Sequence, residues 1–258
     1  MEFPKTLIKR NGYIERIKPF MRKNIAKVLT GQRRVGKSFL LYQLMDQLLV
    51  EEPDANIIYI NFEDFAFSHI QTAEDMHAYI MSKFRKEKYN YIFVDEIQEI
   101  VNFERVIRSL LLNENNDIYI TGSNAKMLSG ELATYLSGRY IEFSVYSLSY
   151  LEFLAFHKLE NNNESLYLYS RYGGLPYLIN LPLKDETVNE YLKSVYSTIV
   201  FRDVVSRYNL RNSSFLEKLV QFLSENIGNL FSAKNISDYL KSQHSTISVN
   251  QIQNYTEY

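Results

Sequence analysis

The hydrophobic residues of the first 145 positions fall into short apolar runs separated by segments of helical spacing. The runs are rich in β-branched and aromatic residues, as buried strands are, and they are "IAKVLT" (25–30), "NIIYINF" (56–62), "YIFVDEIQ" (91–98), "DIYITGSN" (117–124) and "RYIEFSV" (139–145). After the first run, apolar residues recur every three or four positions, at Leu40, Leu41, Leu44, Met45, Leu48 and Leu49. This alternation predicts an α/β fold with a parallel sheet and right-handed crossovers.

From position 148 onward the pattern is helical. Ser149 and Glu152 have the spacing of a capping box and predict a helix start, "ENNNES" (160–165) indicates a loop, and an apolar face from Asp185 to Tyr208 predicts a long helix. Three short amphipathic stretches after Ser214 resemble a winged helix whose wing is absent. We therefore predict an α/β domain at 1–147, an α-helical lid at 148–213 and a truncated winged-helix unit at 214–258.

Composition narrows the picture in a few respects. The formal net charge is −1, so no overall field favours nucleic acid or membrane. The chain has no cysteine, which excludes disulfides and thiolate metal sites and fits a cytoplasmic protein. No run of 18 apolar residues occurs, and the amino terminus lacks an apolar core of signal-peptide length, so we expect no membrane partner.

The first candidate site lies directly after the first predicted strand. "GQRRVGKS" matches the phosphate-binding pattern G-x-x-x-x-G-K-[ST], and it opens the helix that contains the leucines above. Backbone N–H groups of such a loop form an anion nest at a helix amino terminus, a lysine contacts the β and γ phosphates, and a serine hydroxyl ligates Mg²⁺. The predicted nucleotide-binding residues are Gly31, Gln32, Arg33, Arg34, Val35, Gly36, Lys37, Ser38 and Phe39.

A pair of acids ends the third apolar run. Asp95 is positioned to hold Mg²⁺ together with Ser38, and Glu96 to polarise a water for attack on the γ phosphate. Gln98 is close enough to orient that water, or it begins the next helix. Solvated acids at a strand end are the alternative reading. The pattern favours a Mg²⁺-dependent ATPase.

Two other strand ends are polar. The fourth run ends in Ser123 and Asn124, either of which could sense the γ phosphate or cap the following helix. Glu63 and Asp64 end the second run, and we interpret them as a loop cap without a metal role.

These motifs together resemble a known family. "LTGQRRVGKSFLL", "YIFVDEIQE", the stretch from Ile120 to Leu154 and "RYGGLPYL" are similar to the prokaryotic AAA-type ATPases of largely unknown role. The resemblance covers the chain from about Arg10 onward. It implies a five-stranded parallel sheet of order 5-1-4-3-2, a helical lid, a winged helix and a carboxy-terminal nuclease-like domain, before which this sequence ends at Tyr258.

The resemblance also assigns two residues outside the phosphate loop. Arg139 corresponds to an arginine that reaches a phosphate, in cis or from a neighbouring subunit, and the alternative is a surface arginine. Pro176 lies in a stretch similar to the glycine-any-proline motif of signalling P-loop ATPases, where the proline rests on adenine; the alternative is a plain tight turn.

The partners other than ATP are left open by the sequence. A second copy of the chain is one candidate. DNA is weakly supported, because the third predicted tail helix has no Lys or Arg and few phosphate contacts are available. The basic amino-terminal segment, which includes Lys9, Arg10 and Arg16, has an apolar stripe and is interpreted as a docked helix with a solvated basic face. The alternatives to an ATPase are a nucleotide-gated switch with little turnover and a DNA-binding regulator.

Overall fold

The fold is described from a computed structural model of the 258-residue chain. It describes residues 4, 7–123, 136, 138–199, 213–242 and 252. The chain divides into two compact units, residues 1–188 and 189–258. The predicted domain bounds at 147 and 213 stay a prediction.

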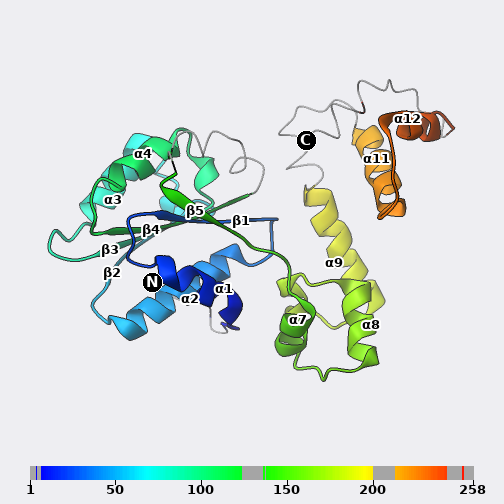
Figure 1. Ribbon diagram of the computed structural model, residues 1–258, viewed down its shortest axis with the longest axis horizontal. Coiled ribbons are helices and arrows are strands. Elements are labelled where there is room, and N and C mark those ends of the chain that lie inside the picture. Colours follow the sequence, from blue (N-terminus) through cyan, green and yellow to red (C-terminus); the bar gives the residue numbers. More distant parts are fainter. Residues whose placement is uncertain are drawn as a thin grey trace. The chain divides into compact units, whose positions relative to one another are not determined.

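The first unit is built on a five-stranded parallel sheet, shown in Figure 1. Its strands are β1 (Ala26–Gly31), β2 (Asn56–Asn61), β3 (Asn90–Asp95), β4 (Asn116–Ser123) and β5 (Tyr140–Ser144). They are hydrogen-bonded in the order β2-β3-β4-β1-β5, and every neighbouring pair is parallel. The predicted order 5-1-4-3-2 is this order read from the other edge, so the predicted fold is confirmed.

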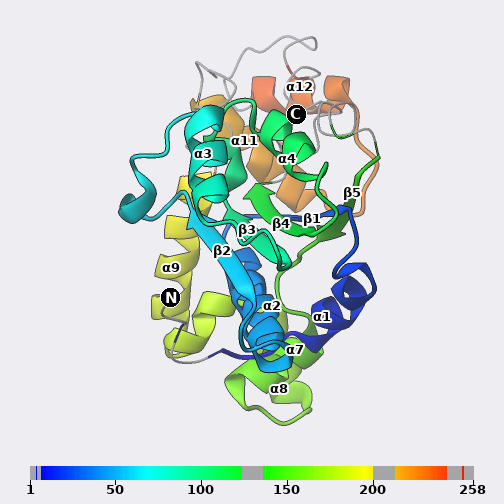
Figure 2. The same ribbon diagram turned by 90° about the vertical axis from the view of Figure 1, so that its left-hand side faces the viewer.

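Helices cover both faces of the sheet, as Figures 1 and 2 show. One face holds α1 (Asn11–Ile17) and α2 (Lys37–Glu51), and the other holds α3 (Ala73–Ser82) and α4 (Phe103–Leu110). Each pair buries its own apolar layer against the sheet. In α2 the leucines at helical spacing are those that point inward, since Leu40, Leu41, Leu44 and Leu48 are fully buried.

One predicted strand is shorter than expected, and one predicted helix is described only in part. β3 ends at Asp95, because Glu96 adopts a left-handed backbone with φ 55° and Ile97–Glu99 forms a 3-10 turn. Gln98 therefore belongs to that turn and does not begin a helix. The long helix predicted from Asp185 is α9 (Asp185–Thr198), and the rest of that prediction, with its basic end, lies outside the described residues.

The predicted lid begins with two antiparallel helices, α7 (Tyr150–His157) and α8 (Asn163–Tyr172), followed by a 3-10 turn at Pro176–Asn180. The capping box is confirmed, because the Ser149 hydroxyl accepts from the Glu152 N–H and the Glu152 carboxylate accepts from the Ser149 N–H. The turn packs tightly on the start of this part of the chain. A β-carbon on Gly174 would lie 2.2 Å from the Leu148 carbonyl oxygen, and Leu148 N–H donates to the Gly174 carbonyl at 2.7 Å. Only glycine permits that approach.

Beyond the end of α9, the second unit is described over residues 213–242, which include α11 (Ser213–Glu225) and α12 (Ala233–Ser242), and at Ile252. Its apolar cluster contains Leu219, Phe222, Ile236, Leu240 and Ile252. Apart from Ile252, the third helix of the predicted winged helix lies outside the described residues, so that prediction stays open. Over the ranges that are described, no helix combines the length and the apolar content needed to cross a membrane.

Candidate functional site

The phosphate loop runs from the end of β1 into α2, at the carboxyl edge of the sheet. Gly31 has φ 152°, and a β-carbon there would lie 2.2 Å from the Val145 carbonyl oxygen, where the chain leaves β5. The loop can therefore begin only with glycine at this position. Val35 is buried, whereas Gln32, Arg34 and Phe39 are exposed.

Lys37 is held inside the loop. Its side chain is only 4% exposed, and Nζ donates to the carbonyls of Gly31 at 3.0 Å and Gln32 at 3.1 Å. The same Nζ lies 3.8 Å from Glu96 Oε1. Burial lowers the pKa of the Lys37 ammonium, against the opposing effect of the nearby Glu96 and Asp95 carboxylates. A desolvated ammonium of this kind is well placed to bind phosphate oxygens.

Asp95 and Ser38 meet across the loop. The Asp95 carboxylate is 1% exposed and accepts hydrogen bonds from the hydroxyls of Thr121 and Ser38. Burial raises the pKa of Asp95, and those hydrogen bonds only partly oppose the rise. Carboxylate and hydroxyl oxygens are the hard ligands that Mg²⁺ prefers, and Mg²⁺ is commonly bound by one or two protein groups together with phosphates. The pair therefore fits a Mg²⁺ ion beside bound phosphates.

Glu96, the residue after Asp95, brings its carboxylate close to the phosphate loop. Its left-handed backbone turns it out of the strand, and its N–H donates to Thr121 Oγ1 at 3.0 Å. Its carboxylate accepts a hydrogen bond from the Gln98 amide. A non-glycine residue in this conformation costs of order 1–3 kcal/mol, and such strain is found mostly where a site requires it. The carboxylate is thereby fixed close to Lys37.

Thr121 is the site residue that sequence reasoning missed. Its hydroxyl donates to Asp95 and accepts from the Glu96 N–H, so one side chain positions both acids. It is fully buried in β4, between β1 and β3. The signal was present, since Thr121 is a polar residue in an apolar strand and, two positions before Ser123, shares its face of the sheet.

The other predicted positions are only partly brought together. Ser123 pairs with Gly31 in the strand register and so ends β4 beside the loop, while Asn124 lies outside the described residues.

The two acids after β2 differ in their contacts. Arg33 forms an ion pair with Glu63 at 3.3 Å. Asp64 caps a 3-10 turn as predicted, but Glu63 contacts the phosphate loop, which the prediction of a plain loop cap missed.

Arg139 lies at the amino-terminal end of the parallel strands, opposite the end at which the phosphate loop lies. Its carbonyl accepts from the Ala26 N–H at the start of β1, whereas the loop follows the end of β1. The five residue-to-residue steps of parallel strand from Ala26 to Gly31 span about 17 Å. With Arg105 and Arg108 it lines a pocket of about 530 Å³. The geometry does not bring Arg139 to the loop of its own chain, and a role across a subunit contact stays a prediction.

Pro176, in the predicted lid, lies beside the phosphate loop. A β-carbon on Gly36 would lie 3.7 Å from Cγ of Pro176, which is van der Waals contact. The proline ring and the phosphate loop are thus neighbours although 140 residues separate them in sequence. The lid turn is therefore within reach of a nucleotide held by the loop.

Comparisons with known proteins identify the family to which the first half of the chain is similar. The AAA domain family matches residues 23–154, about half of the chain, and a domain family of unknown function matches residues 163–258. An uncharacterized protein of Haemophilus influenzae is 35% identical over 260 residues, covering 98% of this chain and 64% of that protein. One of Methanocaldococcus jannaschii is 32% identical over 250 residues, covering 91% and 54%. The chain thus spans less than two thirds of the length of these relatives.

Among solved structures, the chain is similar to the Aeropyrum pernix ORC1 protein in complex with DNA. The identity is 12%, the TM-score is 0.46, and the match covers 98% of this chain and 83% of that one. The likeness is too distant to bear on function.

Proposed function

Because the chain belongs to the AAA domain family, we propose that it binds ATP with Mg²⁺ and hydrolyses it, and that the nucleotide moves the lid. The observation that carries the proposal is the convergence of Lys37, Ser38, Asp95 and Glu96 at one end of the sheet. Lys37 and the loop N–H groups bind the phosphates, and Ser38 and Asp95 hold Mg²⁺. Glu96 accepts a proton from the attacking water. Bound Mg²⁺ supplies charge neutralisation on the phosphate oxygens.

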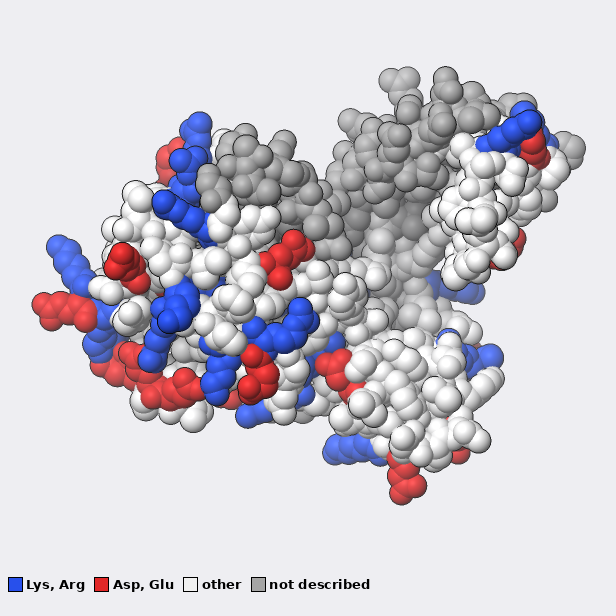
Figure 3. Space-filling model, viewed as in Figure 1, with Lys and Arg blue, Asp and Glu red and all other residues white. Residues whose placement is uncertain are grey.

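The alternatives have weaker support. A switch that seldom turns over would need the same loop, Ser38 and Asp95, but it would not need Glu96 strained into a position beside Lys37. A DNA-binding regulator would need a basic surface. In Figure 3 Lys and Arg alternate with Asp and Glu over the face of the first unit in view. In residues 213–242, three lysines (Lys218, Lys234 and Lys241) are matched by three acids (Glu217, Glu225 and Asp238).

Replacing Lys37 tests nucleotide binding. Lys37→Met keeps the buried aliphatic stem and removes the charge, so the fold is expected to survive. ATP affinity is expected to fall roughly 10- to 100-fold, because a hydrogen bond to a charged group is worth about 1.5–3 kcal/mol. Titration calorimetry measures the affinity, with Lys86→Met at an exposed lysine as the matched control. Equal affinities in the two variants would remove the loop from the proposal.

Replacing Pro176 separates an adenine contact from a plain turn. Pro176→Ala is expected to weaken ATP several-fold and inorganic triphosphate hardly at all, since burying part of one ring is worth on the order of 1 kcal/mol at about 25 cal/mol per Å². A plain turn predicts a stability loss through backbone freedom, with parallel effects on both ligands. Affinities for both ligands, measured on a variant with a parent-like melting transition, decide between the two.

A further inference from the structure

Arg10 is buried at a junction that the sequence assigned to a solvated basic face. Its side chain is 4% exposed, so that part of the amino-terminal prediction is wrong. The other basic residues around it, Lys9 and Arg16, are exposed as predicted. Burial of a guanidinium is costly unless its donors are satisfied. The reason for its burial therefore lies in its partners.

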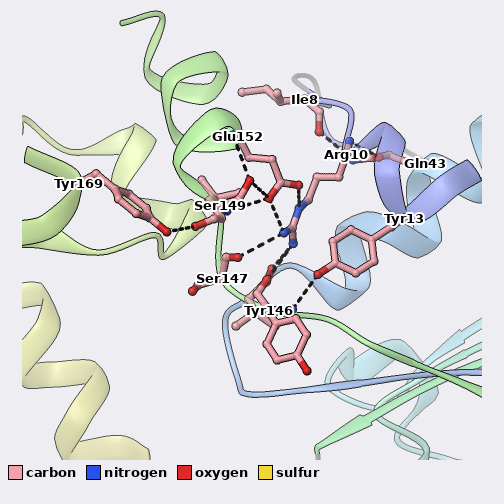
Figure 4. Close-up of polar contacts among 11 residues, drawn as sticks. Ile8, Arg10, Tyr13, Gln43, Tyr146, Ser147, Ser149, Glu152 and Tyr169 are labelled. Atoms are coloured by element: carbon pink, nitrogen blue, oxygen red, sulfur yellow. Dashed lines mark hydrogen bonds and ion pairs between the residues drawn. The ribbon is translucent and has the colours of Figure 1, made fainter. Parts of the chain in front are cut away.

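Every N–H donor of the Arg10 guanidinium is used, as Figure 4 shows for most of the contacts. Nε and Nη2 form a bidentate pair with Glu152 at 2.7 and 3.0 Å. Nη1 donates to the Val35 and Tyr146 carbonyls, both at 3.1 Å, and Nη2 donates to the Ser147 carbonyl at 3.4 Å. Five donors in a fixed plane are a property of arginine alone.

These acceptors belong to three parts of the first unit. Val35 is in the phosphate loop, Tyr146 and Ser147 are in the segment that follows β5, and Glu152 is in the first turn of α7. The chain around Arg10 is itself fixed to α2, because Gln43 accepts from the Arg10 N–H at 2.9 Å and donates to the Ile8 carbonyl at 2.8 Å. Ile8 packs into the apolar cluster of the lid helices. One guanidinium thus joins the loop directly to the lid.

The contact with Val35 has a consequence for the loop. In a planar trans peptide the N–H points away from the C=O. While Arg10 holds the Val35 carbonyl, the Gly36 N–H is directed to the opposite side of the loop. Gly36 is also the loop residue beside Pro176, since a β-carbon on Gly36 would lie 3.7 Å from the proline Cγ.

We infer that Arg10 is a positioning residue that couples the phosphate loop to the lid, through its simultaneous bonds to Val35 and Glu152. The inference rests on the proposed nucleotide site. We call Arg10 with its acceptors Val35, Tyr146, Ser147 and Glu152 the arginine clasp. The clasp orients the Gly36 N–H for a phosphate oxygen and holds α7 in register with the loop, so nucleotide binding is transmitted to the lid. By reciprocity, loosening the lid weakens nucleotide binding.

Two substitutions break the clasp without removing a side chain from the junction. Glu152→Gln loses the charge pairing, but glutamine serves the capping box as well as glutamate does, so the start of α7 is kept. Arg10→Lys keeps the charge and loses the planar fork, so it cannot reach the loop and α7 together. Ser149→Ala is the matched control, because it removes the cap hydroxyl from α7, together with its bond to Glu152 Oε2, and leaves both Arg10–Glu152 bonds free to form.

The absence of cysteine makes the measurement direct. Cysteines introduced at the exposed positions Lys86 and Glu160 carry a dye pair between the α/β part and the lid of the full chain. The dye distance is recorded with and without a slowly hydrolysed ATP analogue, alongside the affinities for ATP and inorganic triphosphate. In the parent and in Ser149→Ala the analogue is expected to shift the distance. In Glu152→Gln and Arg10→Lys the shift is expected to disappear, and both affinities are expected to fall about tenfold, within the usual range of coupling between sites.

The outcomes separate this inference from the proposed function. A parent-like shift in both clasp variants would overturn it, as would loss of the shift in Ser149→Ala, which would point to the stability of α7 alone. If the parent does not bind ATP, the proposed function fails, and the nucleotide-free dye distance still tests the clasp. The clasp predicts a broader distance distribution in Glu152→Gln than in the parent, and equal distributions would overturn it.

Discussion

Glu96→Gln is expected to bind ATP and Mg²⁺ as the parent does and to lose nearly all hydrolysis. The amide keeps the shape of the side chain, its contact with Gln98 and its place beside Lys37, but it cannot accept a proton from water. A positioned general base contributes about 10²–10⁴-fold to a rate, and the loss is expected to be of that size. Single-turnover hydrolysis, with binding measured separately, checks both halves of the expectation.

The matched control is Glu99→Gln, three residues along the same turn. Glu99 is exposed and its removal changes the local charge by the same amount. It is expected to turn over like the parent. If Glu96→Gln also does so, Glu96 is only an acid after a strand. Negligible turnover by the parent itself would favour the nucleotide-gated switch.

Asp117→Ala is expected to produce the largest loss of stability. Lys27 and Asp117 form an ion pair with both side chains fully buried at the start of β1 and β4. Asp117 also accepts from the Tyr119 hydroxyl at 2.8 Å and the Arg22 N–H at 2.8 Å. Burial lowers the pKa of Lys27, and Asp117 opposes that shift, so removing the carboxylate leaves an uncompensated ammonium. Breaking a buried pair in this way costs about 3–5 kcal/mol in the free energy of unfolding.

Thermal and urea unfolding measure that loss. Asp54→Ala is the control, because Asp54 pairs with Arg85 and Lys88 at the surface, where an ion pair is worth about 0–1 kcal/mol. The double variant Lys27→Met with Asp117→Leu is expected to recover part of the stability, since apolar groups can replace a buried pair at little net cost, while the Tyr119 hydroxyl and the Arg22 N–H lose their acceptor. Equal losses of unfolding free energy in Asp117→Ala and Asp54→Ala would show that the buried pair with Lys27 contributes no more than a surface ion pair, against the expectation.

The elements of the α/β part and the residues of the phosphate loop could be predicted from local sequence patterns. Five β-branched runs and helical spacing after Gly36 are local patterns, because burial on both faces of a parallel sheet requires continuous apolar strands. The loop glycines, Lys37, Ser38, Asp95 and Glu96 follow from motif and strand end. The strand order came with the family resemblance, since periodicity carries no information about which strands are neighbours.

The polar groups that contact one another became known only from the folded chain. The Thr121 hydroxyl bonds to both Asp95 and Glu96, and Glu63 forms an ion pair with Arg33. Arg139 lies at the amino-terminal end of the strands, away from the phosphate loop. Arg10 is the clearest case, because its partner Glu152 is 142 positions away and nothing near it in the sequence distinguishes it from the exposed Lys9 and Arg16. A basic residue in an amphipathic segment is normally solvated. Whether it is buried depends on carbonyls and carboxylates that folding brings together from distant segments, and local pattern does not encode them.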